Sequence, residues 1–330
     1  MLSYRPYGVE LEVMPPSLHR LPEGDDLHGK VARYLNQHGV PAMSKAEQDD
    51  SPRAVSPATW SVVSDTTLRR NSELHEGTEV VSPVLQGVTD MKKLRHVAQT
   101  LQDGGFTTNM LTGLHVHHDA NDLDMDGWKR LMVNFYLAEP AFDRLVTLPR
   151  RGDNNPHALS TRRTPDMEEL IEHFDDELTL GDLSRELFPG VRSNDDLKLN
   201  VNAFAKHGTV EFRQHQGSIC PDAIEHWVRL TQAFVDHAAY NPELISVNTG
   251  ITDPLEAWEE VLDDRPLAQD RLLQNLLRIA PADTQQYYRE IAATNNDNRP
   301  ALARAHNQAQ EAEHATLVPS TSSVDTPRLG

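Results

Sequence analysis

Alternation of apolar and polar residues is the clearest signal along the chain. Successive side chains of a β-strand point to opposite faces of its sheet, so this pattern predicts strands with one apolar and one polar face. Near the N-terminus, for example, Val9 and Leu11 alternate with Glu10 and Glu12. The predicted strands cover residues 7–13, 60–65, 79–85, 114–118 and 199–215.

Residues 198–215 predict a β-hairpin whose turn is Lys206-His207-Gly208. In its second strand, apolar Val210 and Phe212 alternate with polar residues. An exposed strand face usually carries Thr, Lys or Ser, whereas this one combines Asn, Glu, Arg and His, which indicates a binding surface. The polar face of the hairpin is expected to carry Asn200, Asn202, Glu211, Arg213 and His215.

Apolar stripes with helical spacing predict helices between and after these strands. They cover residues 26–38, 90–102, 126–146, 254–279 and 283–293. Pro140 is expected to bend or break the third of them, and Pro221 is expected to begin another. The order of elements predicts an α+β fold, in which helices cover one face of a largely antiparallel sheet.

One catalytic domain is expected over residues 1–294. Within it, residues 41–58 and 149–166 are polar and rich in loop-forming residues, and both predict flexible loops. The second loop contains two Arg pairs, which are typical of solvated charges or, alternatively, of a loop that closes over phosphates. Residues 295–330 are low in complexity and predict a partly helical or disordered tail.

The charge balance limits the classes of partner. The chain of 330 residues has 31 Lys and Arg against 50 Asp and Glu, a formal net charge of -19. Nucleic acids and anionic membranes require positive surfaces, so neither is expected as a partner. Cys220 is the single cysteine, which excludes an internal disulfide and a cysteine-rich zinc site.

The cytoplasm is the expected location of the protein. No apolar run approaches the roughly 18 residues of a membrane span. A strand pattern that begins by Val9 leaves no room for a signal peptide.

If the apolar faces set the register of the strands, the polar faces combine into one surface. Several carboxylates on one surface repel one another unless cations lie among them. Oxygen and imidazole ligands without thiolates favour Mg²⁺ or Mn²⁺, and a nearby Arg is then placed to contact an anion such as phosphate. This surface would collect Glu10, Glu12, Glu79, His115, His117, Asn200, Asn202, Glu211, Arg213 and His215.

Each of these features also has an ordinary structural interpretation. The two N-terminal glutamates could form a solvated strand face, and the two alternating histidines could pack without a ligand. The Glu211–Arg213 pair could be a simple ion pair of little energetic weight. Because four separate strands repeat the same arrangement, a functional site is favoured.

Five segments, in order and spacing, resemble the amidoligase family, whose members are carboxylate–amine ligases distantly related to glutamine synthetase and glutamate–cysteine ligase. They are GVELE at 8–12, WSVVSDTTL at 60–68, EGTEVVSPVL at 76–85, TGLHVHHD at 112–119 and LNVNAFAKHGTVEFRQHQGS at 199–218. The resemblance covers residues 8–235. It implies a curved sheet, or partial barrel, with helices on its outer face and metal-ATP on its concave face. It also implies a reaction in which ATP phosphorylates a carboxylate and an amine displaces the phosphate.

The resemblance also implies roles for individual residues. Arg213 would contact the transferring phosphoryl group, Asn200 and Asn202 are expected on the cofactor-binding side, and Arg192 would bind phosphate or the substrate carboxylate. Thr66-Thr67 departs from the small pair that relatives carry after the equivalent of Asp65. The metal ligands would be Glu10, Glu12, Glu79, Glu211 and His115 or His117.

The expected function is therefore an ATP- and Mg²⁺- or Mn²⁺-dependent ligase acting on a small-molecule or peptide carboxylate and an amine. A metal-dependent hydrolase of an amide or phosphate ester, using the same residues without a nucleotide, is the alternative. A scaffold without turnover and a guanidino kinase fit the preserved polar face and the motifs less well. An oligomer is compatible with the sequence, and there is no Gly-rich phosphate loop.

Overall fold

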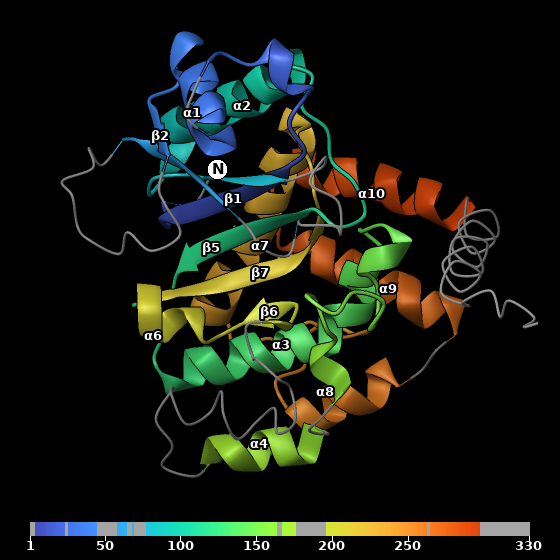
Figure 1. Cartoon of the computed structure of the whole chain (residues 1–330). Coiled ribbons are helices and arrows are strands. Elements are labelled where there is room, and N and C mark those ends of the chain that lie inside the picture. Colours follow the sequence, from blue (N-terminus) through green and yellow to red (C-terminus); the bar gives the residue numbers. More distant parts are fainter. Residues whose placement is uncertain are drawn as a thin grey trace, which may run out of the picture.

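The computed structural model describes residues 4–23, 26–44, 58–64, 68, 77–163, 167–175, 196–262 and 265–297. Its centre is a seven-stranded sheet in the order β2-β3-β4-β1-β5-β7-β6 (Figure 1). Neighbouring strands are antiparallel except β2 and β3. The strands are β1 Tyr7–Val13, β2 Ala42–Ser44, β3 Trp60–Val63, β4 Thr78–Val81, β5 Gly113–Asp119, β6 Leu199–Asn200 and β7 Thr209–Gln216.

The helices surround this open sheet. They are α1 Leu27–Gln37, α2 Gly87–Asp103, α3 Met125–Asp143, α4 Met167–Asp175, α6 Ala203–His207, α7 Pro221–Tyr240, α8 Pro254–Val261, α9 Pro266–Arg278 and α10 Ala282–Asp297. Helix α7 runs behind the central strands and contacts β5, α2 and α3 (Figure 1). The predicted α+β class with a largely antiparallel sheet is confirmed, whereas the partial barrel stays a prediction.

The apolar face of the sheet forms the core with these helices. In β1, Tyr7, Val9, Leu11 and Val13 are each at most 2% exposed. Phe212 of β7 packs edge-to-face on Phe234 of α7, and the buried apolar residues from β1 to α10 form one cluster. Burial of this face fixes the register, because a shift of one residue would move the apolar side chains of a strand to the opposite, polar face.

The register brings the polar residues of the central strands side by side. Glu10 of β1 lies opposite His115 of β5, and His117 lies opposite Glu211 of β7. On the other side of β1, Glu12 lies opposite Glu79 of β4. The expectation that polar residues of separate strands share one face is therefore correct for these residues.

The predicted hairpin is wrong in its first half. Strand β6 ends at Asn200, and the short helix α6 replaces the expected turn. Asn202 has helical backbone angles (φ -64, ψ -22) and is the N-cap of α6, so it leaves the strand and its alternation. Gly208 ends the helix with φ 69, a left-handed conformation that glycine adopts without strain.

His215 also departs from its expected place on the polar face. Three steps along β7, from Phe212 to His215, face two steps along β5, from Val116 to Leu114, so β7 has one extra residue here, which is a β-bulge. The extra residue turns His215 to the side of the core, where its ring lies 4.8 Å from that of Trp227. Strict alternation therefore fails at this end of β7.

Other boundaries differ from the pattern in ways that follow from local chemistry. Pro140 does not break α3, which continues to Asp143, although the missing N–H of Pro140 removes one helical bond and the helix ends within one turn of it. Residues 254–279 form two helices, α8 and α9. Strand β2 falls within the predicted loop 41–58, and residues 298–330 of the predicted tail lie outside the described part.

Among the described residues, no helix is long and apolar enough to cross a membrane.

Candidate metal centre

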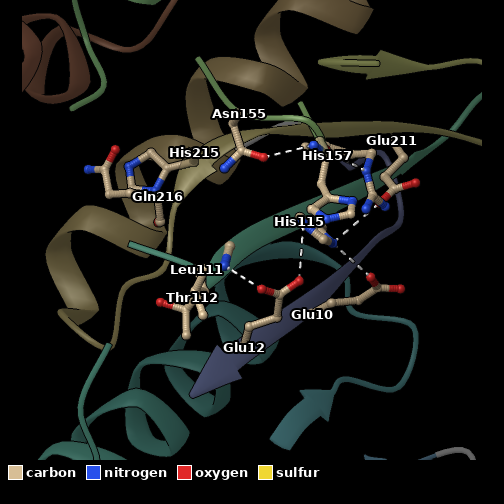
Figure 2. A network of polar contacts seen from close by, with 12 residues as sticks. Glu10, Glu12, Leu111, Thr112, His115, Asn155, His157, Glu211, His215 and Gln216 are labelled. Carbon is tan, nitrogen blue, oxygen red and sulfur yellow. Dashed lines mark hydrogen bonds and ion pairs between the residues drawn. The ribbon is translucent and has the colours of Figure 1, made fainter. Parts of the chain in front are cut away.

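Glu10, His115 and Glu211 form a compact group of potential metal ligands on the polar face (Figure 2). One ligand atom from each lies within 4.8 Å of those of the others. The Nδ1 atom of His115 is 3.2 Å from Oε2 of Glu10 and 3.5 Å from Oε1 of Glu211. Two ligands that bind one Mg²⁺ or Mn²⁺ at right angles are separated by about 3 Å, so the spacing suits a single ion.

Burial of this group differs from one side to the other. The side chains of His115 and Glu211 are 5% and 4% exposed, whereas that of Glu10 is 25% exposed. An ion bound between them would therefore be reached from the side of Glu10. Two carboxylates and one imidazole, without a thiolate, are ligands that fit Mg²⁺ or Mn²⁺.

Glu12 lies on the other side of the same imidazole. Its Oε1 atom is 3.4 Å from Nε2 of His115, and its Oε2 atom accepts a 2.5 Å hydrogen bond from the backbone N–H of Gly113. A carboxylate on the second nitrogen of a metal-binding imidazole fixes the tautomer and the orientation of the ring. The geometry therefore gives Glu12 an orienting contact, and its predicted role as a metal ligand stays a prediction.

His117 lies next to this group, two residues after His115 in β5 and on the same face. Its Nε2 atom is 3.2 Å from Oε1 of Glu10, and its Nδ1 atom is 3.0 Å from Oγ1 of Thr209. Burial acts to lower the pKa of His117, but its hydrogen bond to Glu10 and the charges of Glu211 and Glu10 raise it above its ordinary value.

Glu10 is held between the two imidazoles. Burial acts to raise the pKa of Glu10, but hydrogen bonds and charges of His115 and His117 lower it well below its usual range. The carboxylate therefore stays ionised, which is the form that binds a cation.

Arg213 and Asn200 complete the surroundings of Glu211. The Nη1 atom of Arg213 is 2.6 Å from Oε1 of Glu211, and Nδ2 of Asn200 donates to Oε2 at 2.7 Å. Burial acts to lower the pKa of Arg213, but the carboxylates of Glu211, Glu10 and Glu12 raise it. The guanidinium therefore remains charged beside the potential metal ligands, where an anion could contact both.

The remaining predicted site residues are not brought into this cluster. Glu79 shares the face through its register with Glu12. Asn202 lies at the N-cap of α6 and not in a strand, and His215 faces the core. Arg192 lies outside the described residues.

Sequence reasoning missed three residues that shape the site. Thr209 contacts His117, and only its place in β7 could have indicated this. Gly113 is required because a Cβ atom there would lie 2.6 Å from Nε2 of His115. Arg150, in the predicted loop, is 3% exposed, so the interpretation as a solvated charge is wrong for it.

The buried imidazole of His215 predicts a stability that depends on pH. Burial lowers the pKa of His215 to about 4 from an ordinary value of 6.5. The unfolded chain therefore binds a proton that the folded chain does not between these values, so stability falls as pH falls from about 6.5 to about 4. This imidazole should contribute a loss of about 2 kcal/mol between pH 7 and pH 5.

Chemical denaturation of the wild type and of His215→Gln at both pH values measures this contribution. The free energy of unfolding should fall less steeply in the variant, which lacks the titrating group. The same slope in both proteins would contradict the assignment.

The family of the chain follows from comparison with known proteins. Residues 4–235 match a family described as "Putative amidoligase enzyme". No curated protein matches the chain. The matched region contains all strands of the sheet and the group Glu10, His115 and Glu211. The chain belongs to this amidoligase family.

Proposed function

We propose that the protein is an ATP- and divalent-metal-dependent ligase that joins a carboxylate to an amine. The observation that supports this most is the group of Glu10, His115 and Glu211 with Arg213 beside it, in a member of the amidoligase family. Phosphoryl transfer depends on neutralising and aligning charge, and these are the groups it requires.

In this proposal, Glu10, His115 and Glu211 hold Mg²⁺ or Mn²⁺, with Glu12 or Glu79 contributing to a second ion. A metal ion held there would supply the positive charge that transfer of the γ-phosphoryl group requires. Arg213 donates hydrogen bonds to the γ-phosphoryl oxygens, while its bond to Glu211 keeps the guanidinium in position.

The reaction proceeds in two displacements. A carboxylate oxygen of the acid substrate attacks the γ-phosphorus, the bond between this phosphorus and the β–γ bridging oxygen breaks, and ADP leaves. The amine nitrogen then attacks the acyl carbon, the bond from this carbon to the phosphate oxygen breaks, and inorganic phosphate leaves. The amine gives up its proton to a carboxylate or imidazole of the polar face.

The adenine ring would lie in a cavity of about 380 Å³ beside Glu10 and His117. Its walls include Tyr7, Pro83 and Val84, so a planar base would find apolar contacts next to the metal group. Ligand pockets with a mostly apolar lining and a few polar groups have volumes of about 300–1,000 Å³. The cavity is thus large enough for a base, and the phosphates would extend toward His115.

Release of ADP tests the proposal. Purified protein should form ADP from ATP only with Mg²⁺ or Mn²⁺, and faster with a pool of amino acids, short peptides and polyamines. Omitting either the acids or the amines should reduce the rate. Absence of metal-ATP binding would contradict the ligase and favour the metal-dependent hydrolase, which needs no nucleotide.

A further inference from the structure

We propose that Arg150 binds a second, non-reacting carboxylate of the acid substrate, so that this substrate is a dicarboxylate or an amino acid with a side-chain carboxyl group. The inference rests on the proposed function, because it assigns a position to the acid that the ligase activates. It concerns the end of the polar face opposite the cavity beside His117.

Arg150 is a buried cation with an incomplete set of partners. It is 3% exposed, and among the described residues its guanidinium donates only from Nη2, to the carbonyl oxygens of Thr112 at 2.5 Å and Leu111 at 3.4 Å. No carboxylate of a described residue forms an ion pair with it. Burial lowers the pKa of Arg150 to about 10; the charge of Glu12 acts to raise it and that of Arg213 acts to lower it. A buried guanidinium is costly unless an anion accompanies it, and here Nε and Nη1 remain available for one.

The guanidinium adjoins the metal group. The position that a Cβ atom of Gly113 would occupy is 3.3 Å from Nη2 of Arg150 and 2.6 Å from Nε2 of His115. Leu111 and Thr112, whose carbonyls hold Arg150, lie beside Glu12 in Figure 2. Arg150 is therefore on the Glu12 side of His115, whereas the cavity lies on the His117 side.

A buried ionic network holds the segment that carries Arg150. Lys198 is fully buried, and its Nζ atom contacts Glu139 at 2.8 Å and Asp143 at 2.7 Å, both in α3. Asp143 also accepts from the N–H of Gly152, and Glu139 accepts from the N–H and the hydroxyl of Thr161. The bond from Gly152 fastens the chain two residues after Arg150 to α3, and the bonds from Thr161 fasten the end of the same segment.

The chemistry of the reaction indicates which carboxylate this guanidinium suits. A reacting carboxylate loses its negative charge when the acyl phosphate forms, which would leave a buried cation unpaired in mid-reaction. A carboxylate that does not react keeps its charge throughout. Since no described protein anion pairs with Arg150, a permanent ligand anion is the better match, and the planar fork of Arg binds carboxylates in a bidentate manner.

Calorimetric titration with matched acids tests this assignment. Glutarate and butyrate have similar chains but differ in the second carboxylate, and both are titrated into the protein with Mg²⁺, with and without a non-hydrolysable ATP analogue. Wild type should bind glutarate at least tenfold more tightly than butyrate. Arg150→Gln should lose this preference, because Gln retains a donor for the Thr112 carbonyl but has no charge.

Arg162→Gln is the matched control. Arg162 lies in the same segment, but its guanidinium stacks on Trp258 at 4.8 Å and on Tyr136 at 5.6 Å. The Arg162→Gln variant should prefer glutarate over butyrate as strongly as wild type does. In Arg150→Ala, added methylguanidinium should restore glutarate binding, which a purely structural role of Arg150 would not produce.

Three results would overturn the inference: no preference for glutarate in wild type under either condition, an undiminished preference in Arg150→Gln, or no rescue by methylguanidinium. None of them depends on ATP turnover. A protein that binds glutarate through Arg150 but fails to bind the ATP analogue would contradict the ligase proposal and leave the role of Arg150 intact.

Discussion

Replacing Glu211 by Gln should reduce metal-dependent ADP formation by at least about 100-fold, while the protein remains folded. Glu211 contributes to the proposed metal group, accepts from Asn200 and pairs with Arg213, so one substitution removes the charge on which all three contacts depend. The amide can still accept from Arg213, and the loss of one of several neighbouring carboxylates relieves repulsion. Steady-state assays over a range of Mn²⁺ concentrations, with circular dichroism as the check on folding, measure the effect.

Glu243→Gln is the control for this substitution. Glu243 forms a 2.8 Å ion pair with Arg278 of α9 and lies outside the matched residues 4–235. Its activity should remain within about twofold of wild type, since partly exposed ion pairs contribute little. Full activity in Glu211→Gln would refute the site assignment.

Gly113→Ala should weaken Mn²⁺ binding at least about tenfold through its effect on a neighbouring side chain. The added Cβ would lie 2.6 Å from Nε2 of His115, a distance that atoms do not tolerate, so the imidazole must move. This ring is buried between carboxylates on both of its nitrogens, and any displacement changes its distances to Glu10 and Glu211. Calorimetric titration with Mn²⁺ measures the change.

Gly8→Ala provides the matched comparison for metal binding. Gly8 lies opposite His117 in β1, but a Cβ there would meet its nearest neighbour, Cβ of His117, at 3.8 Å, an ordinary contact. Mn²⁺ affinity in this variant should match wild type. Equal affinities in Gly113→Ala and wild type would show that the position of His115 does not determine metal binding.

Periodicity was sufficient to predict the central strands and the face they share. The pattern of residues 7–13 coincides with β1, and it places Glu10 and His115 on the shared polar face; that these two residues are direct neighbours is shown only by the structure. Burial of one face gives apolar residues a two-residue period, which is visible in the sequence itself. The same period could not indicate the bulge in β7, because an inserted residue depends on how the partner strand curves.

Features that depend on contacts distant in sequence were not predictable. The expected hairpin failed because residues 203–207 form a helix that tertiary packing accommodates, which overrides a weak strand preference. Arg150 resembles any surface arginine in the sequence, and its burial results from contacts with the carbonyls of residues 111 and 112. The need for glycine at 113 becomes visible only when the imidazole of His115 is placed.

The C-terminal helices extend the fold past the matched region. Helices α8, α9 and α10 follow residue 235, yet they contribute buried residues such as Leu276 and Tyr288 to the same apolar cluster. Trp258 of α8 stacks on Arg162, which lies in the segment that also carries Arg150. These helices therefore share the core of the matched region.

The central claim is that Glu10, His115 and Glu211 bind a divalent cation, and pulsed electron paramagnetic resonance of bound Mn²⁺ tests it most directly. We expect a saturable Mn²⁺ site with nitrogen hyperfine coupling from one imidazole, and loss of this coupling in His115→Asn. Added ATP should introduce phosphorus coupling at the same ion. Mn²⁺ that binds without nitrogen coupling, or coupling that survives in His115→Asn, would contradict metal binding by His115.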